Sequence, residues 1–168
     1  MHSSDIHTLY AYNYWANKRQ LEVVAAIPQD QYLKNMDSSH GGIHGTLFHI
    51  MGAEEIWLRR WKGENPATFG KAENYHGFYD LKRHWDQIER EMMDFCHTLQ
   101  TEDDLKRVVH YKDLKGNEHQ QPLWQLMQHL ANHSTYHRGQ VVAMLRQAGI
   151  KPVGTDLITF YRQTQSIQ

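Results

Sequence analysis

Two histidines in the last third of the chain have the spacing of a metal site. His133 and His137 are four residues apart within residues 129–140, which read HLANHSTYHRGQ. In a helix, residues four apart lie one above the other on the same face, so both imidazoles can reach one ion. Metalloproteases use this spacing in the HExxH motif, but here Ser134 follows His133 where that motif has its glutamate. The pair therefore predicts metal binding without zinc-protease chemistry.

The apolar pattern around the pair supports this interpretation. At about 100° per residue, both histidines fall on one helical stripe together with Leu126, Leu130, Val141 and Met144. Burying one imidazole is compatible with a hydrogen-bonded core residue, whereas a stacked pair in the same stripe favours a metal. His129 extends the row, but eight residues of helix place it about 12 Å from His137, so these two cannot share an ion.

A third ligand must come from another helix, and spacing alone leaves several candidates. His40, His44 and His49 lie in or before the second long helix, and His84 and His97 lie in the third. His49 is on the flank of its helix and not on the main apolar side, so periodicity does not single it out. All of these candidates stay open at this point.

The elements that must position these residues are predicted to be helices. Apolar periodicity and the breakers at its ends indicate long helices from about Ser3 to Ala26, Ile43 to Trp61, Tyr79 to Leu99 and Pro122 to Ala148. A short polar hairpin is expected from Val108–Lys112 and Glu118–Gln121, and a short last helix around Leu157–Tyr161. The pattern predicts an all-α fold, a four-helix bundle with a hairpin in the crossover before the last long helix. We find no repeat or linker, so residues 1–168 are expected to form a single domain.

Composition excludes several classes of partner. The 18 basic and 19 acidic residues give a formal net charge of -1, which offers no electrostatic footprint for nucleic acid or anionic lipid. No stretch approaches the roughly 18 apolar residues of a membrane span, and the first residues lack the pattern of a secretory signal. The lone Cys96 excludes an internal disulfide and is expected to be a buried small hydrophobe. We therefore expect a cytoplasmic protein.

Further motifs resemble the DinB/YfiT-like superfamily of metal-dependent enzymes. Residues 10–17 (YAYNYWAN) are similar to the opening helix of that family, and residues 47–50 (LFHI) resemble the motif that supplies its first histidine ligand. Residues 129–140 resemble its NHxxYHRGQ-like motif, which supplies the other two. The resemblance implies a four-helix bundle that holds one divalent metal ion with His49, His133 and His137.

The resemblance also implies an activity. Three neutral imidazoles with an open position suit zinc or nickel, and members of the family transfer low-molecular-weight thiols. We expect a metal-dependent enzyme that transfers such a thiol to a small electrophile or hydrolyses a small substrate; no catalytic residue is assigned. The alternative is a non-catalytic metal-binding or sensing protein whose ion has a closed fourth protein ligand. A purely structural bundle with hydrogen-bonded histidines is a weaker option.

Related bundles pair through helix faces, so a homodimer is expected, which light scattering would test.

Other residues near the histidine motifs carry their own expectations. Arg138 turns away from the histidine face and is expected to make contacts between helices, whereas Gln140 lies nearer that face and could orient a ligand. Glu54 is the nearest acid or base to His49 by sequence, but it lies about 140° away around the helix, so we assign it no such role. Gly139 within a helix costs roughly 1 kcal/mol relative to alanine, which suggests close backbone packing.

Overall fold

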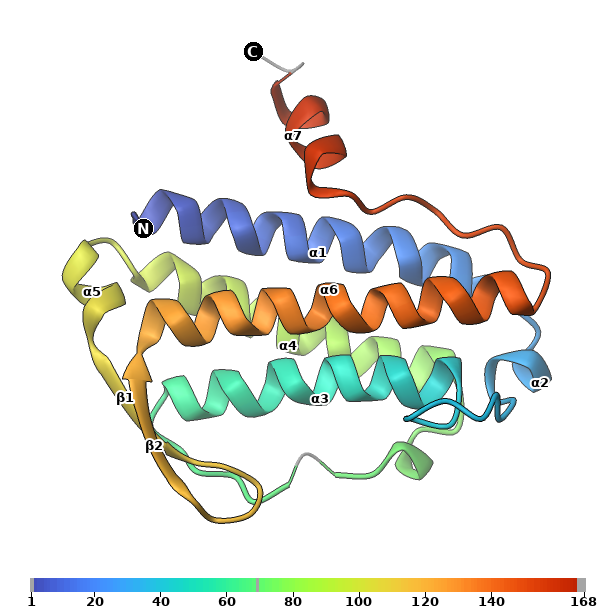
Figure 1. The fold of residues 1–168 in the computed structure, drawn as a ribbon, viewed down its shortest axis with the longest axis horizontal. Coiled ribbons are helices and arrows are strands. Elements are labelled where there is room, and N and C mark those ends of the chain that lie inside the picture. Colours follow the sequence, from blue (N-terminus) through green and yellow to red (C-terminus); the bar gives the residue numbers. More distant parts are fainter. Residues whose placement is uncertain (1, 69, 166–168) are drawn as a thin grey trace.

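A computed structural model describes residues 2–68 and 70–165, which are mostly helical (Figure 1). The four long helices are α1 (Ser3–Ala25), α3 (Ile43–Trp61), α4 (Phe78–Thr98) and α6 (Leu123–Gln147). The shorter elements are α2 (Gln29–Tyr32), the 3-10 turn η1 (Ala72–Asn74), α5 (Glu102–Lys106), β1 (Val108–Lys112), β2 (Glu118–Pro122) and α7 (Leu157–Gln165). The described residues thus form seven α-helices and one two-stranded sheet.

The four long helices run side by side (Figure 1). Helix α3 packs against α6 and α4, and α1 packs against the same two helices. The contact between α3 and α6 is therefore on the opposite side of the molecule from the contact between α1 and α4. This arrangement brings His49 on α3 to the same interface as the histidines of α6.

Each long helix contributes apolar side chains to both of two buried clusters. The cluster nearer the hairpin includes Ile6, Tyr10, Trp61, Met92, Leu105 and Leu130. The cluster nearer α2 includes Val24, Ile43, Leu47, Leu81, Val141 and Met144. Full burial of such a side chain stabilises the fold by about 1.5–3 kcal/mol, so these clusters hold the helices together. None of the described helices combines the length and the apolarity needed to cross a bilayer.

A buried polar network lies at the middle of the long helices, between the two apolar clusters. Oε1 of Glu54 accepts hydrogen bonds from the Nδ2 atoms of Asn13 and Asn17, both at 3.0 Å. Oε2 of the same residue accepts one from Nε1 of Trp85 at 2.8 Å. Nη1 of Arg138 donates to Oδ1 of both asparagines, at 2.7 and 2.8 Å. The network joins all four long helices, so Arg138 makes the interhelical contacts that the sequence predicts.

The predicted hairpin is confirmed, but its boundary with α6 differs from the expectation. Strands β1 and β2 pair antiparallel, with Val108 opposite Pro122. Pro122 has φ -59° and ψ 140°, which is not helical, so it ends β2 and α6 begins at Leu123. Helices α2 and α5 lie in segments for which the sequence predicts no helix, because four or five residues are too few to show a helical period.

Candidate metal centre

Two facing helices bring the three predicted ligands together. Nε2 of His49, on α3, lies 3.1 Å from Nε2 of His133, on α6. The ring of His137 lies one turn further along α6, with its centre 4.4 Å from that of His133 and 4.5 Å from that of His49. Helix α6 supplies two imidazoles because their four-residue spacing stacks them on the face that packs against α3.

The spacing of these nitrogens fits a divalent ion. Two nitrogens that each lie about 2.1 Å from one zinc ion in a tetrahedral site are about 3.4 Å apart, close to the 3.1 Å between His49 and His133. Ligand atoms of His49, His137 and a further residue, His40, all lie within 4.8 Å of one another. Such a group can hold a metal ion, and ligands that are all imidazoles suit zinc, nickel and other late divalent ions.

His40 joins this cluster from the loop between α2 and α3. Its ring stacks on that of His49 with the centres 3.9 Å apart and the planes 17° from parallel. The centre of the His137 ring is 5.2 Å away. The sequence gives His40 as one of several candidates, and helical periodicity carries no information about a loop residue. The sequence feature that could have pointed to His40 is the pair Gly41 and Gly42, which follows it directly and precedes α3.

Burial lowers the pKa values of three imidazoles in the cluster, those of His40, His49 and His133. The pKa of His49 is lowered to about 4 and that of His133 to about 3, first by burial and then by the neighbouring histidines. Burial and His137 also lower the pKa of His40. Within residues 2–68 and 70–165, the buried Nδ1 of His133 has no hydrogen-bond partner. Neutral imidazoles present lone pairs, which is the form in which histidine binds metals.

Gln140 orients one of the proposed ligands. Its Oε1 lies 2.8 Å from Nδ1 of His137. Because an amide oxygen can only accept a hydrogen bond, Nδ1 carries the proton and Nε2 keeps its lone pair. An outer partner of this kind is common around metal-binding histidines. The expectation that Gln140 could orient a ligand therefore agrees with the geometry.

Other candidate histidines of the sequence lie outside the cluster. The ring nitrogens of His44 contact the hydroxyl of Tyr32 at 2.9 Å and the carbonyl oxygen of Ala72 at 3.0 Å. Nδ1 of His84 lies 2.6 Å from the hydroxyl of Tyr75. Each of these residues is therefore committed to a local contact and not to the candidate metal centre.

The edge of the cluster is formed by His129 and Trp57. The ring of His129 is centred 5.9 Å from that of His133 and 5.5 Å from that of Trp57. His129 is thus a neighbour of His133, as its place in the helical row suggests. Glu54 belongs to the buried network instead, where burial raises its pKa and the hydrogen bonds from Trp85 and the asparagines lower it.

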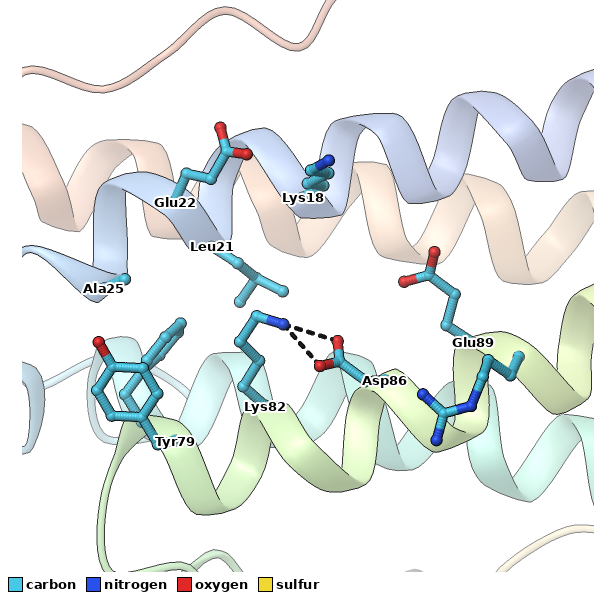
Figure 2. A pocket seen from close by; sticks show the side chains of 10 residues that line it. Lys18, Leu21, Glu22, Ala25, Tyr79, Lys82, Asp86 and Glu89 are labelled. Atoms are coloured by element: carbon cyan, nitrogen blue, oxygen red, sulfur yellow. Dashed lines mark hydrogen bonds and ion pairs between the residues drawn. The ribbon is translucent and has the colours of Figure 1, made fainter.

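A separate hollow of about 400 Å³ lies between α1 and α4 (Figure 2). Figure 2 shows Leu21 pointing between the helices and Nζ of Lys82 donating to the carboxylate of Asp86, at 2.6 Å for the shorter contact. Glu89 borders the same hollow, and its pKa is raised to about 7, first by burial and then by the charges of Glu54 and Asp86. None of the side chains drawn there is a histidine, so the hollow is not the candidate metal centre.

Known proteins resemble the chain along almost its whole length. The family model of the DinB family matches residues 1–167. Protein DinB of Bacillus subtilis (strain 168) is 27% identical over 169 residues, which cover 94% of this chain and 95% of that protein. A DinB-like protein from Bacillus cereus ATCC 10987 has a solved structure with a TM-score of 0.63 and 20% identity, covering 86% of this chain and 91% of that chain. A DinB-like protein from Bacillus subtilis gives a TM-score of 0.64 and 18% identity, covering 87% and 94%. At these identities the two structures support the fold alone.

Proposed function

Because the chain belongs to the DinB family, we propose that it is a metal-dependent enzyme that transfers a low-molecular-weight thiol to a small electrophile. The observation that supports this most is the 3.1 Å separation of the Nε2 atoms of His49 and His133. We assign these two residues and His137 as ligands of one divalent ion, zinc or nickel. When bound, such an ion favours the deprotonated form of a thiol or water beside it.

Thiol transfer, unlike hydrolysis of the metallopeptidase kind, does not require a carboxylate base beside the metal ion. In the transfer, the thiol sulfur forms a bond to a carbon of the electrophile. The bond from that carbon to the leaving group breaks with its electron pair, and the thiol proton passes to solvent. A hydrolase of the metallopeptidase kind also uses a carboxylate base, and Glu54, one turn beyond His49, is fully buried in the core network. This difference favours transfer over hydrolysis.

The side chains around the proposed centre fix the directions of the imidazoles and the positions of their protons. Gln140 holds the proton of His137 on Nδ1, so that Nε2 stays available as a ligand atom. Burial disfavours the protonated form of His49 and His133 at neutral pH. The rigid interface between α3 and α6 fixes the directions of the three imidazoles, which is what a reactive centre requires.

The proposed scaffold is a four-helix bundle of α1, α3, α4 and α6. Each of these helices packs against two of the others, and the DinB-like structures have a similar fold. We place the activity in the cytoplasm, where low-molecular-weight thiols are kept reduced. The cysteine of the chain is buried, and burial raises its pKa to about 12, so Cys96 does not compete as a nucleophile.

The test is conjugation of a thiol to a chromogenic electrophile. Purified protein loaded with zinc or nickel is mixed with chloro-dinitrobenzene or monochlorobimane and a panel of thiols that includes bacillithiol and mycothiol. We expect a rate above background that is lost on chelation and in His137→Ala and retained in His76→Ala, since His76 is exposed and far from the cluster in sequence. Absence of any metal-dependent rate across the panel would remove the transferase proposal.

A further inference from the structure

His40 differs from the three proposed ligands in the element that carries it. His49, His133 and His137 belong to two long, tightly packed helices. His40 lies in the irregular segment between α2 and α3, yet its ring is stacked on His49 and its ligand nitrogen lies within 4.8 Å of those of His49 and His137. A half-buried imidazole from a loop thus lies beside the imidazoles that the helices supply.

Two glycines allow this loop to approach α3. A Cβ atom on Gly45, in the first turn of α3, would collide with the carbonyl oxygen of His40. A Cβ atom on Gly42 would collide with the carbonyl oxygen of Lys34, at the start of the same loop. The turn itself is closed by a hydrogen bond from the backbone N–H of Gly41 to the carbonyl oxygen of Ser38, at 2.9 Å. The absence of side chains at Gly42 and Gly45 therefore allows the backbone of His40 to lie against the first turn of α3.

We infer that His40 is a fourth, exchangeable ligand of the ion held by His49, His133 and His137, and that a thiol cosubstrate takes its place. This inference rests on the proposed metal centre. Four protein ligands complete the tetrahedral shell of zinc, whereas an enzyme needs one position for its substrate. A loop held by a few backbone contacts is displaced at a smaller cost in free energy than a helix in the core. His40 is therefore the ligand that leaves.

A fourth ligand that can leave is compatible with both interpretations of the sequence, an enzyme and a non-catalytic metal-binding protein. With His40 bound, the centre is closed, as in a protein that only stores or senses a metal. With His40 displaced, three imidazoles and one open position remain, as in an enzyme. The resting protein is protected from adventitious ligands, and only a ligand that binds the ion more strongly than an imidazole opens the centre. A thiolate is such a ligand for zinc and similar ions.

The experiment uses the chain of residues 1–168 loaded with cobalt chloride, because the visible absorption of cobalt(II) reports its coordination. Wild-type protein is expected to give the intense bands of a four-coordinate centre, and X-ray absorption should count four imidazoles. His40→Ala should lose one imidazole and bind cobalt at least about tenfold more weakly, the lower end of the effect known for residues that merely orient a ligand. Free imidazole added to this variant should restore the wild-type spectrum.

Two further variants separate ligation from damage to the fold. Gly45→Ala keeps the His40 imidazole but forces its backbone away, so it should reproduce the spectrum of His40→Ala. The matched control is Gly139→Ala, because a Cβ atom there meets nothing within 4 Å, and it should leave the spectrum unchanged. His44→Gln serves as the histidine control, since His44 is committed to Tyr32 and Ala72. Circular dichroism establishes that each variant is folded.

Adding thiol tests the exchange. In wild-type protein, a low-molecular-weight thiol should add a sulfur-to-cobalt charge-transfer band and reduce the imidazole count from four to three. In His40→Ala, the same band should appear at lower thiol concentration with the count constant at three. Identical spectra and imidazole counts for cobalt-loaded wild type and His40→Ala would overturn the inference while leaving the three-histidine centre in place. Failure of wild-type protein to take up cobalt would overturn both.

Discussion

Nδ1 of His137 lies 2.8 Å from Oε1 of Gln140, so the residue three positions along α6 fixes which nitrogen of that imidazole carries the proton. The three-residue spacing places the two side chains next to each other on the helix surface. The amide oxygen can only accept a hydrogen bond, so Nδ1 of His137 is the donor and Nε2 is the nitrogen left for a metal ion. The position of one proton thus links the α6 sequence to the proposed metal centre.

Replacing Gln140 by leucine should weaken metal binding without removing it. The leucine side chain has a similar volume but no acceptor, so the Nδ1–H of His137 loses its partner and the ring loses its fixed orientation. We expect a 10- to 100-fold lower affinity for zinc, the range found for such outer partners, measured by competition with a chromogenic chelator. Gln140→Glu retains an acceptor and should bind zinc at least as well as wild-type protein. Equal affinity of wild type and Gln140→Leu would mean that this contact does not orient the ligand.

Arg138→Met should destabilise the fold and not the metal centre itself. Arg138 is buried, and its loss leaves the side-chain Oδ1 atoms of Asn13 and Asn17 without their donor beside the buried carboxylate of Glu54. Removing one partner from such a buried polar group costs about 3 kcal/mol, which urea unfolding would measure. The control is Arg146→Met, an exposed arginine on the same helix, whose free energy of unfolding should change by less than about 0.5 kcal/mol. An equally small change for Arg138→Met would show that the network adds little to stability.

Glu89 should make stability depend on pH between about 4.5 and 7. Its pKa rises from the ordinary 4.5 to about 7 in the folded protein, chiefly through burial. The Glu89 carboxylate therefore binds a proton more tightly in the folded protein than in the unfolded chain, and its contribution to stability falls as the pH rises through this window. Glu89→Gln should remove this decline and stabilise the protein at pH 8 by up to about 2 kcal/mol, since partial exposure screens the effect.

The control for Glu89 is Glu22→Gln, an exposed carboxylate across the same hollow (Figure 2). Thermal or urea unfolding of wild-type protein and of the two variants is measured at pH 5 and pH 8. Both variants remove one negative charge from the hollow, but only Glu89→Gln removes a partly buried one. Glu22→Gln should follow the wild-type dependence. The lowered pKa values of His49 and His133 make stability rise with pH over the same range, so the Glu89 effect is read as the difference between wild type and Glu89→Gln. An equal change in stability between pH 5 and pH 8 in these two proteins would contradict the assignment.

The sequence predicts the helices well because their signal is periodic. The apolar stripe and Gly63 define α3 at Ile43–Trp61 as the structure has it, and the four-residue spacing gives the relation of His133 to His137. Helical periodicity also predicts that Arg138 makes contacts between helices, and the structure confirms this prediction. Cys96 is buried, also as expected.

Residues whose role depends on contacts between distant segments are harder to predict. His40 lies in a loop, which approaches α3 closely because Gly42 and Gly45 have no side chains. No periodic pattern in the sequence reveals this approach. His49 is identified through a family motif, since its place on the flank of α3 gives no periodic signal. The expectation for Gly139 is wrong: a Cβ atom there meets nothing within 4 Å, so close packing does not explain this glycine.

The metal content of untagged protein tests the proposed centre most directly. Wild-type protein, His133→Ala and His137→Ala are compared with His2→Ala and His76→Ala, which replace exposed histidines, by elemental analysis after dialysis against a small excess of zinc. We predict about one zinc ion per chain in wild type and in both control variants. Loss of most of that zinc is predicted in His133→Ala and His137→Ala, with the fold retained by circular dichroism. Equal zinc content in all five proteins would contradict the assignment of the centre to these histidines.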